Sequence, residues 1–142
     1  MPFRENIDLI VDGENIYITG YTKSLSGSQD LWILKLDSTG NLLRDKVIDF
    51  GLNEKGNRIF SRDGKIFACG YMQSMTGTMD DIFVCSMDEA GNNISVKHFP
   101  IGGVEYGNFI GESQNHLFAG GIKTDSNTMK IYEIDDSLTS CN

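Results

Sequence analysis

Acidic side chains near tyrosines are the residues of this chain that could do chemistry. They recur in stretches rich in Ser, Thr and Gly, at Asp30, Glu54, Asp80, Asp81 and Glu105, and Tyr106 follows the last of them. Carboxylates beside aromatic rings can bind a sugar or a cation, because they combine hydrogen-bond acceptors and negative charge with an apolar ring. The alternative is structural. Asp30 and Asp81 would then hydrogen-bond their own loops, and the tyrosines would pack one repeat against the next.

Catalysis would need more than isolated carboxylates. Asp80 and Glu54 could act as the acid–base pair of a hydrolase if they met across a central channel, but nothing in the sequence singles them out. The two histidines, His98 and His116, have no partner at metal-ligand spacing, and His116 stands at a strand entrance open to water. The sequence contains no nucleophile elbow, phosphate loop, zinc pattern or EF-hand calcium loop. We therefore predict no catalytic residue, no metal ligand and no cofactor.

An internal repeat must position these side chains. The segment "GYTKSLSGSQDLWILKLDSTGN" at 20–41 returns as "GYMQSMTGTMDDIFVCSMDEAGN" at 70–92, and a looser copy, "GGIKTDSNTMKIYEIDDSL", begins at Gly120. The repeat spacing from Gly20 to Gly70 to Gly120 is thus fifty residues each time. A period of 40–50 residues with several short strands per unit is typical of propeller blades.

Each repeat reads as a meander of antiparallel strands. Short apolar or alternating runs are separated by tight turns such as Asp12-Gly13 and Asp63-Gly64, which favour two-residue hairpins. At Asp37-Ser38-Thr39-Gly40-Asn41 the aspartate can cap the turn and the glycine can adopt positive φ. The third repeat stops at "DSLTSCN", so its fourth strand is missing or very short, and about eleven strands are expected. The sequence predicts an all-β chain, a single domain over 1–142 with repeats at about 5–51, 52–103 and 104–138.

These segments resemble the bacterial β-propeller repeat family whose blades carry "GYT.S...G..D.W..KLD..GN". The resemblance covers almost the whole chain, is close in the first two repeats and is loose in the third, where Thr128 replaces the Asp before the third strand. Its motif is structural, so it implies a fold and no catalytic residues. The longer connections of such blades emerge on one side of the disc, which places Glu54 and Glu105 in loops at 51–56 and 102–107.

Three blades cannot close a ring, because closed propellers have about four to eight blades. At roughly 60° per blade, two head-to-tail chains would make a six-bladed ring, and a swapped amino-terminal strand could complete the third blade. The alternative is that the missing blades belong to a longer chain. Lys130 stands where Trp32 and Phe83 stand in the first two repeats, which makes that sheet face less apolar.

The net charge and the cysteines limit the classes of binding partner and the cellular location that we expect. A net charge of −8 without a basic patch argues against nucleic acid and anionic membranes. No long apolar run and no signal-like start occur, and the three cysteines, Cys69, Cys85 and Cys141, lack CxxC spacing. We expect reduced, buried cysteines and a cytoplasmic location, or a secreted one if a leader was removed.

The function class expected from these features is a non-catalytic propeller module that binds a partner or assembles with itself. A carbohydrate-binding propeller is the first alternative, and a hydrolase or lyase with acidic channel residues is the second.

Overall fold

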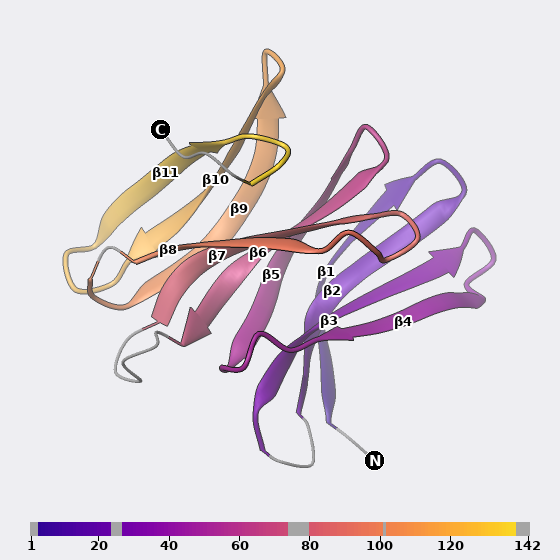
Figure 1. Ribbon diagram of the computed structural model, residues 1–142, viewed down its shortest axis with the longest axis horizontal. Coiled ribbons are helices and arrows are strands. Elements are labelled where there is room, and N and C mark those ends of the chain that lie inside the picture. Colours follow the sequence, from indigo (N-terminus) through magenta and orange to yellow (C-terminus); the bar gives the residue numbers. More distant parts are fainter. Residues whose placement is uncertain (1–2, 24–26, 74–79, 101, 139–142) are drawn as a thin grey trace.

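The computed structural model describes residues 3–23, 27–73, 80–100 and 102–138. Every regular element in this part of the chain is a β-strand, and the strands form three antiparallel sheets stacked in chain order (Figure 1). The all-β prediction and the expected eleven strands are confirmed. We refer to the three sheets as blades 1, 2 and 3.

Blades 1 and 2 are four-stranded meanders, and blade 3 has three strands in the described residues. Blade 1 contains β1 (Arg4–Asp12), β2 (Asn15–Lys23), β3 (Gln29–Asp37) and β4 (Leu42–Ile48). Blade 2 contains β5 (Glu54–Arg62), β6 (Lys65–Gln73), β7 (Asp80–Asp88) and β8 (Ser95–Phe99). Blade 3 contains β9 (Glu105–Ser113), β10 (His116–Lys123) and β11 (Thr128–Ile134). The expected absence of a fourth strand in the third repeat therefore holds over the described part of the chain.

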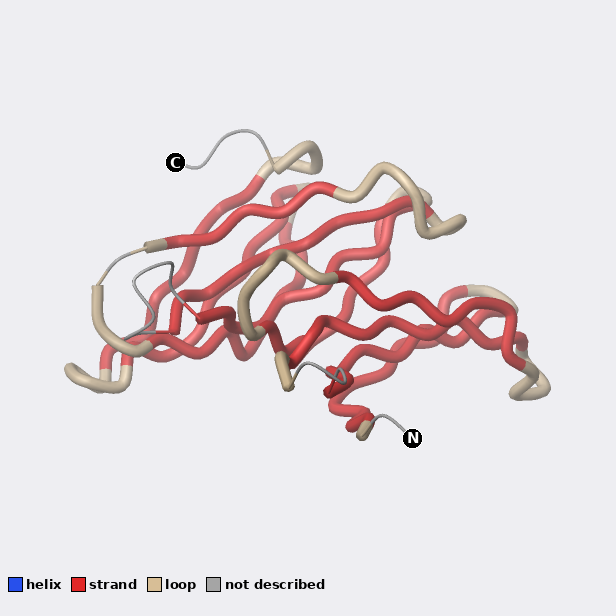
Figure 2. The backbone as a smooth tube through the Cα atoms, turned by 60° about the horizontal axis from the view of Figure 1, so that its bottom comes forward, coloured by secondary structure: helices blue, strands red, loops and turns tan. Residues whose placement is uncertain are grey.

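The turns follow the chemistry that the sequence predicts. The carboxylate of Asp37 accepts hydrogen bonds from the backbone N–H groups of Thr39 and Asn41, both at 2.9 Å, and Gly40 has φ 88°. The β9–β10 hairpin reaches the geometry of the Asp63-Gly64 turn without glycine: Asp63 and Gly64 have φ of 50° and 75°, and Gln114 and Asn115 have φ of 48° and 69°. Because successive strands run antiparallel, these tight turns lie on one side of the stack, and the described connections at 49–53 and 124–127 lie on the other (Figure 2).

Two apolar layers hold the blades together. Blade 1 packs on blade 2 through a layer centred on Leu31 and Phe83, and blade 2 packs on blade 3 through a layer that includes Phe67 and Leu117. The first strands β1, β5 and β9 contact one another in succession along the inner edge. Cys69 and Cys85 are buried and unpaired inside these layers, as expected.

Each first strand carries an irregularity at the same place. The pairing with the second strand skips Ile7 in β1, Asn57 in β5 and Asn108 in β9, so each blade has a β-bulge beside its inner edge. This register corrects the alignment of the third repeat. Gly121, not Gly120, takes the place of Gly70. A Cβ at Gly70 would lie 1.8 Å from the carbonyl oxygen of Lys55, and a Cβ at Gly121 would lie 1.7 Å from that of Tyr106, in each case just before the bulge. The spacing is therefore fifty residues and then fifty-one.

Candidate functional site

Two buried glutamates begin the inner strands of blades 2 and 3. Glu54 and Glu105 open the repeated segment Glu-x-Gly-Asn, at 54–57 and 105–108, and both side chains are 0% exposed. The Oε2 atom of Glu54 and both carboxylate oxygens of Glu105 accept no hydrogen bond from any described residue. A buried carboxylate oxygen that accepts no hydrogen bond is costly, so these two positions call for an explanation.

Junction 1, the contact between blades 1 and 2, gathers three carboxylates. Asp30 of β3, Asp49 just after β4 and Glu54 of β5 each offer an oxygen within 4.8 Å of the others. Burial raises the pKa of Glu54 to about 7, the N–H groups of Leu52 and Phe50 oppose this rise, and the charges of Asp49 and Asp30 add to it. Asp49 is exposed, so the cluster reaches solvent at one side.

Junction 2, the contact between blades 2 and 3, carries the register-equivalent pair Asp81 and Glu105. Burial raises the pKa of both carboxyls, and each is further raised by a carboxylate neighbour. Here, however, positive charge lies close by. Lys123 and Lys130 lower the pKa of Glu105, and His98 lowers that of Asp81.

A polar hollow of about 400 Å³ opens beside junction 1 on the side of the longer connections. The Asn53 side chain spans it: its Oδ1 accepts from the Gln29 N–H and its Nδ2 donates to Gln73 Oε1, both at 2.9 Å. The ammonium of Lys55 lies 4.3 Å from the centre of the Tyr21 ring. The lining residues are Lys23, Gly27, Gln29, Asn53, Lys55, Tyr71, Gln73 and Asp80.

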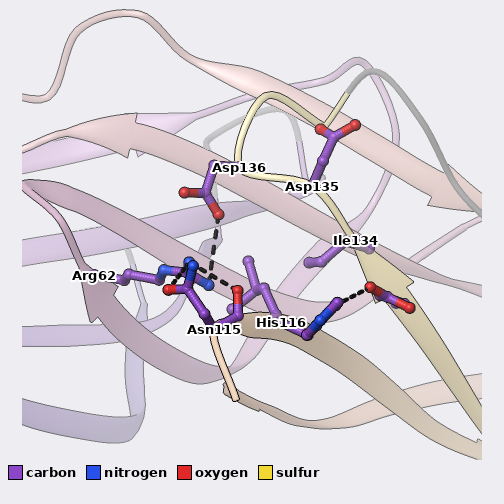
Figure 3. A pocket seen from close by; sticks show the side chains of 8 residues that line it. Arg62, Asn115, His116, Ile134, Asp135 and Asp136 are labelled. Atoms are coloured by element: carbon purple, nitrogen blue, oxygen red, sulfur yellow. Dashed lines mark hydrogen bonds and ion pairs between the residues drawn. The ribbon is translucent and has the colours of Figure 1, made fainter. Parts of the chain in front are cut away.

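A second hollow, of about 280 Å³, lies among the tight turns of blades 2 and 3 (Figure 3). Arg62 of β5, whose side chain is only 10% exposed, donates to the backbone oxygen and the Oδ1 of Asn115, at 3.0 and 2.8 Å. Its guanidinium also lies 3.8 Å from Asp136. His116 is exposed, as predicted, and pairs with Glu133. Because these charged groups bind each other across two blades, this hollow is best explained as a structural link.

The six residues predicted as a ligand site do not form one loop-borne cluster. All of them lie at strand ends, since Asp30, Asp80 and Asp81 enter the third strands and Glu54, Glu105 and Tyr106 begin the first strands. Four are buried: Asp30, Glu54, Asp81 and Glu105. The placement of the two glutamates in loops is therefore wrong, because the inner strands begin earlier than their glycines suggest.

Two of the specific contacts considered from sequence can be compared with the structure. Glu54 meets Asp30 and Asp49, whereas Asp80 lines the polar hollow beside Lys55. The Tyr71 and Tyr106 rings pack edge to face with centroids 4.6 Å apart, which is the predicted contact between tyrosines of successive blades.

Asp49 was not predicted, because its sequence neighbours mark only the end of a strand. The available signal for the paired junctions was Glu-x-Gly-Asn at 54–57 and 105–108, although the same pattern at 89–92 lies in a tight turn.

The three stacked meanders and their inner-edge bulges define a β protein of the propeller class. Among solved structures, the chain is similar to that of sucrose-6-phosphate hydrolase from Lactobacillus gasseri, with a TM-score of 0.60 and 8% sequence identity. The similarity covers 95% of this chain and 33% of that one, so this chain spans about a third of the hydrolase. At this identity the similarity shows the fold alone. No family model and no curated protein matches the sequence.

The residues that the structure describes include no helix with the length and hydrophobicity of a bilayer-crossing segment.

Proposed function

We propose that this chain is a non-catalytic propeller module that completes its ring with a second copy bound head to tail. The observation that carries the proposal is a repetition of surfaces. The outer faces of blades 1 and 3 present apolar residues at the register positions that form the internal junctions of blade 2.

The free face of blade 3 repeats the face that blade 2 turns toward it. Phe118, Met129 and Ile131 occupy the register positions of Phe67, Ile82 and Val84. The three blade 2 residues are completely buried at junction 2, whereas Met129 is 64% and Ile131 59% exposed. Exposed β-branched and long apolar side chains on a flat sheet face indicate a surface that is covered in the working protein.

The free face of blade 1 repeats the other face of blade 2. Leu9, Ile16 and Ile18 occupy the register positions of Ile59, Ile66 and Ala68, which pack in junction 1. Leu9 is 58% exposed, and Val11 beside it is 68% exposed. The centre of this face is partly covered by the chain itself, as Arg4 lies over the Trp32 ring at 4.7 Å.

A second copy would cover both free faces. The free face of blade 3 resembles the side of blade 2 that packs in junction 2, and the free face of blade 1 resembles the side of blade 2 that packs in junction 1. Blade 3 of one copy would meet blade 1 of the next as blade 2 meets blade 3. A heterologous contact of this kind closes only if the rotation fits, and two sets of three blades fall within the usual range of about four to eight. The proposed assembly is a closed dimer of six blades.

The test is the solution mass by light scattering over a concentration series, with two variants and a control. Val11→Lys and Ile131→Lys each place a charge on one free face, at side chains that are 68% and 59% exposed. Ile94→Lys places the same charge on the exposed edge of blade 2, away from both faces.

The parent chain and Ile94→Lys are expected at twice 15.8 kDa, and the two face variants at 15.8 kDa with an unchanged far-ultraviolet circular dichroism spectrum. A parent chain that stays monomeric at every concentration, or face variants that remain dimeric, would overturn the proposal. A monomeric result would instead point to further blades from a longer chain.

Carbohydrate binding is the second candidate, favoured by the polar hollow beside junction 1. Its amides, lysines and tyrosine offer the donors and acceptors that sugar hydroxyls need. One solved structure with this fold is named as a sucrose-6-phosphate hydrolase. Hydrolysis itself is less well supported here, since Glu54 and Glu105 are fully buried and a catalytic carboxylate must reach its substrate.

A glycan array followed by calorimetry tests this second function. Binding that is lost in Gln73→Ala and kept in His116→Ala, a change in the opposite hollow, would support the site. Silence across the array would count against it.

A further inference from the structure

The three carboxylates of junction 1 come from three separate pieces of chain. Asp30 lies near the start of β3, Asp49 follows β4 and Glu54 begins β5, and one oxygen of each lies within 4.8 Å of the others. The residues belong to both sides of the junction, so their approach is a product of blade stacking. Three negative charges at this separation repel one another unless a proton or a cation intervenes.

Each carboxylate is oriented by a neighbour. Ser28 Oγ donates to Asp30 Oδ1 at 3.0 Å, and the N–H groups of Gly51 and Leu52 donate to Asp49 Oδ1 and Glu54 Oε1 at 2.6 and 3.0 Å. Such outer hydrogen bonds hold ligands in place at metal sites. The remaining Glu54 oxygen, Oε2, is fully buried and accepts no hydrogen bond from the described residues. A buried oxygen of this kind needs a partner that the described chain does not supply.

Junction 2 serves as an internal comparison. It has the same buried pair, Asp81 and Glu105, but Pro100 follows β8 where Asp49 follows β4. The largest charge effect on Glu105 is that of Asp81, and Lys123 and Lys130 oppose it, whereas the charge effects on Glu54 are those of Asp49 and Asp30. Junction 2 thus carries positive charge of its own, and junction 1 has a third carboxylate instead. Lys23 and Lys55 line the polar hollow beside junction 1, but among the described residues neither forms an ion pair with the three carboxylates, so a cation from outside the chain would supply the missing charge.

We propose that Asp30, Asp49 and Glu54 bind a divalent cation, with Ca²⁺ as the best match. An all-oxygen set suits a hard cation and lacks the nitrogen and sulfur ligands that select zinc. Calcium oxygens at about 2.3–2.6 Å allow opposite ligands to stand about 5 Å apart, so calcium fits any separation up to the 4.8 Å limit of this cluster. Calcium also tolerates irregular ligand sets, whereas magnesium at about 2.1 Å demands near-ideal octahedral geometry. Exposed Asp49 provides the entry side and room for water ligands.

The bound cation would tie blade 1 to blade 2. It would join β3 and the β4–β5 connection to the inner strand β5, at the point where the Oε2 atom of Glu54 has no hydrogen-bond partner among the described residues. A cation that binds only the folded chain stabilises it by mass action. This role concerns a junction inside one chain, so its test does not depend on whether two chains form a ring.

The test begins with protein freed of metal by a chelator. Calorimetry with CaCl₂ is expected to show one saturable site per chain, and thermal unfolding is expected to shift upward with calcium, with a smaller shift for magnesium. Asp49→Asn should weaken calcium binding by at least about tenfold, in line with the loss of one charged ligand. Glu54→Gln keeps the shape of the side chain and should abolish the calcium response.

Asp81→Asn is the matched control, because it changes the equivalent buried aspartate at junction 2. It should leave calcium binding unchanged. The proposal fails if the metal-free parent shows neither saturable heat nor a thermal shift with millimolar calcium. It also fails if Asp81→Asn reduces binding as much as Asp49→Asn, or if Glu54→Gln stays folded and keeps the full calcium response.

Discussion

The glycine of the Glu-x-Gly-Asn segment sets the distance between blades. Gly107 lies on β9 just before the bulge, and a Cβ added there would stand 2.2 Å from the carbonyl oxygen of Gly70 and 2.9 Å from Cys69 Sγ. Both atoms belong to blade 2, and the first is backbone. We predict that Gly107→Ala pushes the two blades apart.

The expected cost follows from this geometry. Real Cβ contacts do not fall below 3.0 Å, so the 2.2 Å contact requires β9 and β6 to separate locally by about 0.8 Å. Overpacking a well-packed region usually costs about 1–3 kcal/mol. Because backbone rather than a flexible side chain is in the way, we expect the upper end, about 3 kcal/mol of unfolding free energy.

Gly111→Ala is the matched control on the same strand. Its added Cβ would meet nothing within 4 Å, and Gly111 does not have positive φ. The alanine restricts the unfolded chain, so this variant should be unchanged or more stable by up to about 1 kcal/mol.

Urea unfolding, followed by far-ultraviolet circular dichroism and by the fluorescence of the single Trp32, measures both variants. The two probes also report whether blade 1 unfolds together with the rest. If the two variants differ by less than about 0.5 kcal/mol, the close approach of the blades at Gly107 does not constrain the fold, and the reasoning is refuted.

Three further outcomes are expected. Phe83→Ala removes a fully buried ring from the junction 1 layer and should lower the unfolding free energy by about 3–5 kcal/mol in urea titrations. Burial raises the pKa of Glu105 above its ordinary 4.5, so the folded chain holds this proton more tightly than the unfolded chain, and stability falls as the pH rises past 4.5. Glu105→Gln should therefore be more stable than the parent at pH 8 and lose this advantage near pH 4, while a pH-independent difference would contradict the assignment. Burial also raises the pKa values of Cys69 and Cys85 to about 12, so in a Cys141→Ser background both thiols should react with a disulfide reagent only after unfolding, and fast reaction of the native chain would count against it.

Much of the fold was predictable because its determinants are local. The Asp37 turn and the Asp63-Gly64 hairpin depend on a few adjacent residues, and alternating apolar positions set which face of each strand is buried. The third repeat was misaligned by one residue at Gly120. The bulge that makes Gly121 the obligatory glycine is a contact between strands, and the sequence pattern alone shows two adjacent glycines without saying which one meets the carbonyl oxygen.

The candidate site was less predictable from the sequence than the fold. The sequence by itself determined the number of blades, the tight turns, the buried cysteines and the recurrence of Glu-x-Gly-Asn at 54–57 and 105–108. Only the tertiary structure decided that Glu54 lies fully buried between blades, and that Asp49 joins Asp30 beside it. The physical reason is the distance along the chain between the residues that interact. A turn is stabilised by contacts within a few residues, whereas the cluster forms between residues on different strands of two blades, and it is the stacking distance between those blades that brings their charges together.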